Sequence, residues 1–208
     1  MADPVLDDHP VDASATPAPR PRRVAPFVAL AVGVVFAVLF VILAGSKSRT
    51  NESDPDSPLL GKAAPAIVGP TLDGGTFDLS RRRGSWVVLN FFQSSCAPCK
   101  AEHPELVEFA DAQAGQTGGA ELVTVVWRDS TDAVQSFFDD NGGGDWPVVL
   151  DESNVAVAYG VAKVPETWIV DPNGVIRVHY VGKVTADGPN GLSAKIAELQ
   201  AQDALVTG

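Results

Sequence analysis

The pattern of hydrophobic and polar residues divides the chain into one isolated apolar run and a longer part in which apolar and amphipathic runs alternate. The isolated run covers residues 26–45, PFVALAVGVVFAVLFVILAG, and contains no charged residue. At a rise of about 1.5 Å per residue, a helix of this length spans about 30 Å, one hydrocarbon core. A surface helix of a soluble protein would need a polar face, which this run lacks. The pattern therefore predicts a transmembrane anchor over residues 26–45.

The charges beside this run predict its orientation. Arg20, Arg22 and Arg23 precede it, and positively charged flanks stay on the cytoplasmic side of a membrane. Lys47 and Arg49 follow the run and weaken the asymmetry, although acidic residues come soon after them. We therefore expect a single-pass protein whose C-terminal part lies outside the cytoplasm.

The remaining segments follow from the same reading. Residues 1–25 are rich in Pro, Ala and Asp without an apolar period, which predicts a disordered cytoplasmic tail. Residues 46–58 are polar and predict a flexible linker to a folded domain over residues 59–205. A cleaved signal peptide is the alternative to the anchor, because Ala44 and Ser46 suit a cleavage site. The apolar run exceeds the usual signal-peptide core of about 7–15 residues, which favours the anchor.

The alternating part of the chain predicts an α/β domain. Residues 86–92 and 121–127 are unbroken apolar runs typical of buried central strands, and residues 97–114 between them have helical spacing. This order predicts a mixed sheet with helices on both faces, joined by right-handed crossovers. The further expected elements are a helix capped by Ser130 or Thr131 and stopped by glycines, an extended piece over 146–151, a short helix within 153–161, two strands joined at 172–174, and a helix over about 190–202.

Charge then limits the partners of this domain. The chain has 26 Asp and Glu residues against 15 Lys and Arg residues, a formal net charge of -11. An acidic surface argues against nucleic acid, because binding phosphates needs clustered Lys and Arg. The one basic cluster, residues 81–83, lies beside Gly84 and predicts a solvated turn.

The two cysteines of the chain, Cys96 and Cys99, lie in the sequence SSCAPCK. A c-type haem site would need histidine where Lys100 stands, and a structural zinc site would need four ligands, whereas the chain has no second C-x-x-C. A copper site formed by the cysteines and His103 stays open as an alternative. A purely structural disulfide would close a very short loop and stabilise little. The pattern favours a redox-active pair.

The expected position of this pair supports redox chemistry. Cys96 follows a central strand and opens a helix, where free N–H groups and the helix dipole stabilise a thiolate. Pro98 suits the first helical turn, and Lys100 adds a nearby positive charge. Cys99 lies one turn further and can resolve a mixed disulfide formed at Cys96.

These residues resemble a known family. FFQSSCAPCK followed by Pro104 resembles the thioredoxin superfamily, in which C-x-P-C-K opens a helix that contains a proline five residues after the second cysteine. The stretches 61–92 and 145–176 resemble the membrane-anchored TlpA/ResA/CcmG (DsbE)-like branch, and the likeness covers about residues 59–183. It implies a thioredoxin-like fold, a central mixed β-sheet flanked by helices, with an N-terminal β-hairpin extension and no cofactor.

The resemblance also implies roles for residues outside the cysteine pair. Pro165 matches the cis-proline that faces the cysteines in this superfamily, and its cis bond would direct the Val164 backbone toward the substrate chain. Glu166 matches the acidic residue that follows this proline, where a carboxyl group could tune the cysteine pKa values or transfer protons. An exposed carboxylate without a catalytic role is the alternative for Glu166.

Three positions depart from the family or from thioredoxin itself. Ser95 stands where the branch usually has tryptophan, so we expect Ser95 and Pro98 to form a more open substrate-binding surface beside the first cysteine. Lys163 stands where glycine is common and joins Lys100 as a cation that favours the thiolate. Asn90 occupies the place of a buried acid in thioredoxin, which makes Glu166 the candidate proton acceptor.

The implied function is that of a thiol-disulfide oxidoreductase of a bacterial cell membrane. Within the family, such a protein reduces the disulfide of apocytochrome c during cytochrome c maturation and takes electrons from a CcdA/DsbD-type membrane protein. A disulfide oxidant or general reductase for exported proteins would use the same residues in the other direction or with other partners. A copper-binding assembly factor and a non-catalytic binding module are the alternatives from other functional classes.

Overall fold

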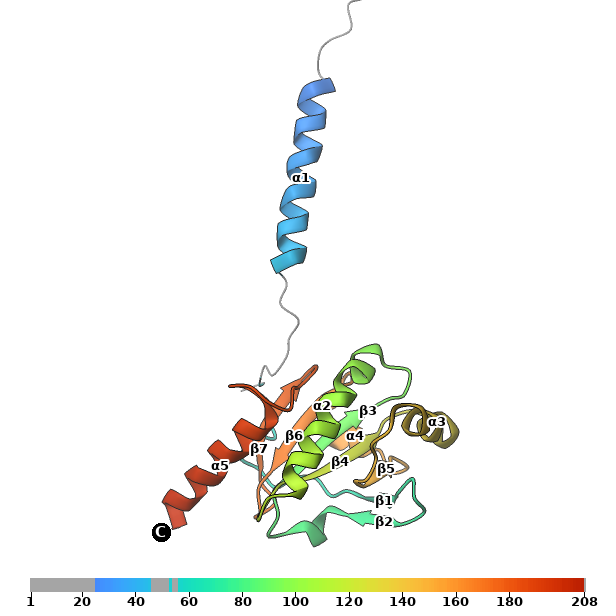
Figure 1. Cartoon of the computed structure of the whole chain (residues 1–208), viewed down its shortest axis with the longest axis vertical. Coiled ribbons are helices and arrows are strands. Elements are labelled where there is room, and N and C mark those ends of the chain that lie inside the picture. The colour runs from blue at the N-terminus through green and yellow to red at the C-terminus, as the bar shows by residue number, and fades with distance from the viewer. Residues whose placement is uncertain (1–24, 46–52, 54–55, 208) are drawn as a thin grey trace, which may run out of the picture. The chain divides into compact units, whose positions relative to one another are not determined.

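The computed structural model describes residues 25–45, 53 and 56–207 of the chain and divides into two compact units, Met1–Lys47 and Ser48–Gly208 (Figure 1). In the first unit, helix α1 spans Ala25–Gly45, and its side chains are described for residues 28–39. Within the part of the chain that is described, no helix is both long and apolar enough to cross a membrane. The predicted tail, except for Ala25, lies outside the described residues, and the anchor stays a prediction.

The second unit is built on a five-stranded sheet with the order β5-β4-β3-β6-β7. The central strand β3 is parallel to β4 and antiparallel to β6, and all six of its residues are buried. Because an unbroken apolar run has no polar face to turn to solvent, it occupies the centre of the sheet, as predicted. The strands are β3 (Val87–Phe92), β4 (Glu121–Val126), β5 (Val148–Leu150), β6 (Glu166–Val170) and β7 (Ile176–Val181).

Three helices cover one face of this sheet: α2 (Ala97–Ala114), α3 (Thr131–Asn141) and α5 (Leu192–Thr207). Figure 1 shows α2 and α5 side by side over the strands. Alternate strand residues such as Val88 and Ile169 share a buried cluster with Phe109 of α2 and Ile196 of α5. The consecutive right-handed crossovers from β3 to β4 and from β4 to β5 place α2 and α3 on the same face.

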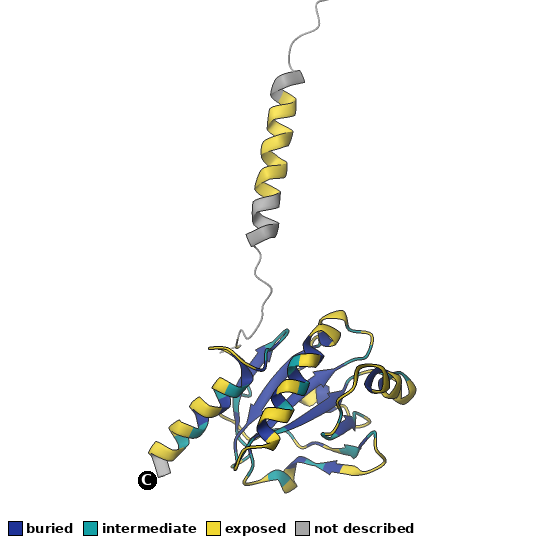
Figure 2. Cartoon of the chain, viewed as in Figure 1, coloured by how far each residue is buried: buried dark blue, intermediate teal, exposed yellow. Residues whose placement is uncertain are grey.

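The opposite face is covered by the short helix α4 (Val155–Ala158) and by a hairpin of β1 (Val68–Pro70) and β2 (Thr76–Asp78). Here Leu89 and Trp168 of the strands pack with Phe77 of β2 and with Tyr159, which follows α4. Figure 2 shows the resulting buried layer along the strands between two more exposed outer layers. The predicted mixed sheet, its helices on both faces and the N-terminal hairpin are all confirmed.

The boundary of the folded domain differs from the predicted one. Ser53 forms an isolated antiparallel bridge with Tyr180 of β7. Ser57 is buried, and its carbonyl oxygen accepts a hydrogen bond of 3.2 Å from the Leu60 amide. The end of the predicted linker therefore contacts the domain, which begins before residue 59. Polar composition misled the prediction, because the Ser53 bridge to β7 is formed by backbone groups that composition does not report.

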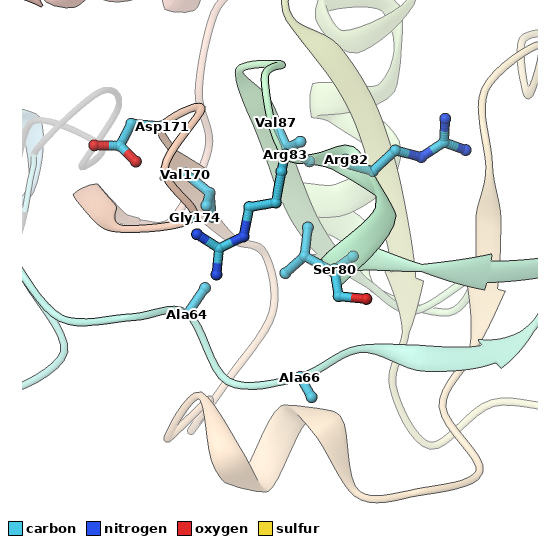
Figure 3. Close-up of a pocket in the computed structure, with 10 residues that line it drawn as sticks. Ala64, Ala66, Ser80, Arg82, Arg83, Val87, Val170, Asp171 and Gly174 are labelled. Carbon is cyan, nitrogen blue, oxygen red and sulfur yellow. The ribbon is translucent and has the colours of Figure 1, made fainter.

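The basic cluster at residues 81–83 lies at the end of the 3-10 helix η1 (Leu79–Arg82), beside the first residues of β3. Arg82 is half-buried, pairs with Glu121 at 3.4 Å and lies over the Phe77 ring at 5.4 Å. Arg83 lines a cavity of about 190 Å³. Figure 3 shows its guanidinium next to Gly174. The predicted solvated turn is correct for the exposed Arg81 and Arg83, whereas the Arg82 side chain, 39% exposed, also packs against its neighbours.

Candidate active site

The two cysteines are joined in a disulfide at the N-terminus of α2, at the carboxyl end of the central strand. Cys96 is the N-cap residue, with an extended backbone at φ -75° and ψ 112°, and its Sγ accepts a hydrogen bond of 3.2 Å from the Cys99 amide. Pro98 occupies the first turn, as predicted from its missing N–H. Cys99 is only 2% exposed, whereas Cys96 is half-buried. Cys96 is thus the sulfur that a partner can reach.

The loop before β6 lies directly beside this sulfur. The Val164–Pro165 peptide bond is cis, as the family resemblance implied. The Val164 carbonyl oxygen lies 3.6 Å from Cys96 Sγ, and the Pro165 carbonyl accepts a hydrogen bond of 2.9 Å from the Gly182 amide. Lys163 is exposed on the same loop. A partner chain that approaches Cys96 therefore meets the backbone of this loop, which we call the cis-proline loop (residues 162–165).

Glu166 is buried at the start of β6, on the sheet face that also carries Trp168. Its Oε1 accepts a hydrogen bond of 3.3 Å from the Ala162 amide, and its Oε2 lies 3.0 Å from His179 Nε2. The His179 ring in turn stacks on Trp168 with centroids 3.6 Å apart. The exposed-carboxylate alternative for Glu166 is therefore wrong. Its observed contacts tie the cis-proline loop to the sheet, and its role in proton transfer stays a prediction.

A second buried carboxyl group, Glu102, was missed by the sequence reasoning. It lies on the inner side of α2, three residues after Cys99, and is 1% exposed. Asn90 Nδ2 donates to Glu102 Oε1 at 3.2 Å and to Thr167 Oγ1 at 3.1 Å. Burial raises the pKa of Glu102 to about 8, although the Val184 amide and Lys183 favour its charged form. Asn90 stands where thioredoxin has a buried acid, and Glu102 brings a buried carboxyl group into contact with it from α2.

His103 is buried rather than exposed on α2. Its Nε2 donates a hydrogen bond of 2.8 Å to the Gly142 carbonyl oxygen, and its ring contacts Phe137 edge-on at 4.9 Å between centroids. His103 Nε2 is therefore already engaged by a backbone carbonyl oxygen. Among the described side chains, no three His, Cys, Asp or Glu residues are grouped so that they could hold a metal ion.

The surface around Cys96 is completed by the loop between β4 and α3. Gln93 Nε2 donates to the Arg128 carbonyl at 3.0 Å, and the Ser94 amide donates to Asp129 Oδ2 at 2.6 Å. The Arg128 guanidinium lies 4.8 Å from the centroid of the half-buried Trp127 ring. Ser95 and Lys100 are exposed, as expected from the open sequence beside the cysteines. This loop network thus includes the aromatic side chain of Trp127, which directly follows β4, whereas the position before Cys96 carries Ser95.

Comparison with known proteins agrees with this geometry. Residues 60–179 match the model of the AhpC/TSA family. The thiol:disulfide interchange protein HelX of Rhodobacter capsulatus is 34% identical over 142 residues, which cover 65% of this chain and 77% of HelX. The thiol-disulfide oxidoreductase ResA of Geobacillus kaustophilus is 32% identical over 155 residues, which cover 73% of this chain and 87% of that ResA. The structure of a secreted thiol-disulfide isomerase from Corynebacterium glutamicum superimposes with a TM-score of 0.54 at 28% identity. The superposition covers 64% of this chain and 88% of the isomerase.

The family match spans more than half of the chain, and it includes the cysteine pair, the cis-proline loop and both buried carboxyl groups. The relatives that share this stretch are named for thiol-disulfide exchange. The chain therefore belongs to the AhpC/TSA family and is a thiol-disulfide oxidoreductase with a thioredoxin-like fold, similar to ResA, DsbE and HelX.

Proposed function

We propose that the protein is a membrane-tethered reductase that acts outside the cytoplasm on a disulfide of apocytochrome c. The observation that carries the proposal is the position of the half-buried Cys96 Sγ. This sulfur accepts a hydrogen bond from the Cys99 amide at a helix N-terminus and lies beside the cis-proline loop. An anionic sulfur is favoured at this position. The similarity to HelX and ResA supports cytochrome c maturation as the process served.

The proposed reaction transfers two electrons to the partner. The Cys96 thiolate attacks one sulfur of the partner disulfide, which forms a mixed disulfide and releases the other partner sulfur as a thiolate. Cys99 then loses its proton and attacks Cys96 Sγ. This step forms the Cys96–Cys99 disulfide present in the structure and releases the partner as a dithiol. A membrane protein of the CcdA/DsbD type then reduces the disulfide.

The direction of electron flow depends on the reduction potential rather than on the residues present. We expect the Cys96–Cys99 pair of the full-length protein, in a nonionic detergent, to have a midpoint near or below the value of about -270 mV of thioredoxin. Equilibration with dithiothreitol and glutathione buffers, followed by thiol alkylation, measures this midpoint. A value close to that of the oxidant DsbA, about -120 mV, would instead establish the protein as a disulfide oxidant.

The proposed tether is the apolar stretch 26–45, which carries no charged side chain and lies within α1. We expect the full-length protein to remain in the membrane fraction after carbonate extraction at high pH. A protease added outside the cytoplasm should digest the C-terminal domain. A variant in which Phe36 and Leu39 are both replaced by Lys should become extractable, because a charged residue at the centre of a span costs about 2.5–3.5 kcal/mol. An extractable wild-type protein of full length would refute the tether and leave the exchange reaction untouched.

A further inference from the structure

We propose that four cationic side chains around Cys96 form a recognition surface for acidic residues that flank the partner's disulfide. The four are Lys100, Arg128, Lys163 and Lys183, and we call them the cationic ring. They come from four different segments, each of which belongs to α2 or contacts α2 or the residues just before it. The inference rests on the proposed exchange with a protein disulfide, and it adds the charge of the partner segment.

Two members of the ring lie on the segments that carry the reactive sulfur and its carbonyl neighbour. Lys100 is exposed and directly follows Cys99 in α2. Lys163 is exposed and directly precedes Val164, whose carbonyl oxygen lies 3.6 Å from Cys96 Sγ. A partner chain that pairs with the cis-proline loop therefore approaches two exposed lysines, one adjacent in sequence to Cys99 and one adjacent to Val164.

The other two members are tied to the same region through hydrogen bonds. Lys183 Nζ donates to the Ala101 carbonyl oxygen at 3.4 Å, next to Lys100. The Arg128 carbonyl oxygen accepts a hydrogen bond of 3.0 Å from Nε2 of Gln93, a residue three positions before Cys96. The loop after β7 and the loop after β4 thus contribute the other two members of the ring.

The carboxyl groups of these segments offset only part of the ring's charge, because two of the four are buried and the half-buried Asp129 and Glu105 are outnumbered by the four cations. Glu102 and Glu166 are buried. Asp129 accepts hydrogen bonds from the Ser94 and Ser130 amides, and Glu105 accepts one from the Ala186 amide. The next exposed carboxylates along the chain are Asp132, in the first turn of α3, and Asp187, in the loop after β7. This cationic face stands out in a chain whose formal net charge is -11.

Arg128 is the member best prepared to bind a carboxylate. Its backbone has a φ of 52°, a left-handed conformation that is uncommon for a residue other than glycine. The contact with Gln93 holds the Arg128 backbone, and the guanidinium packs over the Trp127 ring. A guanidinium that is already ordered loses less entropy when it forms a bidentate pair with a carboxylate.

The expected consequence is electrostatic selection among partner disulfides. Opposite charges on the two surfaces raise the rate of productive encounter. Salt weakens this effect, because at 0.1 M ionic strength exposed charges more than about 10 Å apart are largely screened from each other. The net charge of the whole protein predicts the reverse preference, for basic partners. The two effects are therefore separated by a single comparison of acidic and basic substrates.

The test uses three synthetic peptides that contain the same C-x-x-C disulfide flanked on each side by three Glu, three Gln or three Lys residues. Reduced full-length protein in nonionic detergent is mixed with each peptide at pH 7, and acid-quenched samples are separated to give the second-order rate of reduction. At low salt we expect the Glu-flanked peptide to react at least about tenfold faster than the Lys-flanked peptide. In 0.5 M NaCl the ratio should fall to about twofold or less.

The variant R128Q/K163Q should lower the Glu-to-Lys rate ratio at least about threefold. The ratio is the readout because any change in Cys96 reactivity affects all three peptides equally. R81Q is the matched control, since Arg81 is exposed at the opposite end of β3, and it should retain the wild-type ratio. Equal rates for all peptides, a preference for the Lys-flanked peptide, or an unchanged ratio in R128Q/K163Q would overturn the inference while leaving the exchange reaction intact. Failure to reduce any of the peptides would contradict the exchange reaction itself, and the inference with it.

Discussion

The variant Cys99→Ala is expected to form a stable mixed disulfide with its partner through Cys96 and to lose multiple turnover. The half-buried Cys96 remains available for attack, but no second thiol is left to displace the partner. The Cys99 side chain is 2% exposed, so alanine at this position should leave the accessible surface around Cys96 nearly unchanged. Incubation with an oxidised apocytochrome c fragment, followed by non-reducing electrophoresis and mass spectrometry, identifies the complex.

Cys96→Ala is the matched control for this experiment. The remaining thiol at position 99 is buried beneath the first turn of α2, so we expect no mixed disulfide and no reduction. A trapped complex through Cys99 in this variant would reverse the assigned order of the two cysteines. Rapid release of the partner from Cys99→Ala would show that another group resolves the intermediate.

The order of strands and helices was predictable because their sequence patterns are local. The helix over residues 97–114 and the hydroxyl cap at Ser130 have the expected bounds. In each case the signal, an apolar period or a capping residue, lies within the element itself. The cis bond before Pro165 came from the family resemblance alone, because no local pattern separates it from the trans form.

The environment of the site was harder to predict because distant residues create it. Glu102 is one of several glutamates in a polar part of α2, and its burial depends on Asn90 and Thr167 from two strands. The Asn90 amide, which replaces a buried acid, was the available signal that a carboxyl group would arrive from another element. Arg128 lies over Trp127 and has a left-handed backbone, which no local sequence pattern predicts.

The buried Glu102 predicts that the stability of the oxidised protein falls as the pH rises from about 4.5 to about 8. In the unfolded chain this carboxyl ionises near its ordinary pKa of 4.5, whereas in the folded protein it stays neutral up to about 8. Between these values the unfolded state alone gains from ionisation, so the free energy of unfolding decreases. Each unit of pKa difference corresponds to about 1.4 kcal/mol, so the loss reaches several kcal/mol at most. Above about pH 8 this contribution becomes constant.

Glu102→Gln should remove this dependence, because glutamine cannot ionise and its oxygen can still accept the Asn90 hydrogen bond. Urea unfolding of the oxidised full-length protein at pH 4.5, 6 and 8 measures the effect without a contribution from thiol ionisation. We expect the variant to match the wild type at pH 4.5 and to be more stable by about 2 kcal/mol or more at pH 8. Glu108→Gln, an exposed carboxyl on the same helix, should change stability by less than about 0.5 kcal/mol at every pH.

The same substitution tests whether Glu102 exchanges a proton with Cys99. The two side chains lie three residues apart on the buried side of α2, and a carboxyl group with a pKa of about 8 can accept or return a proton near neutral pH. We therefore expect the rate of partner release in Glu102→Gln to fall and its pH profile to lose the inflection near pH 8. Formation of the mixed disulfide at Cys96 should change little. A variant that is stabilised at pH 8 but releases its partner at the wild-type rate would restrict Glu102 to a structural role. Cys99 would then lose its proton to solvent rather than to Glu102.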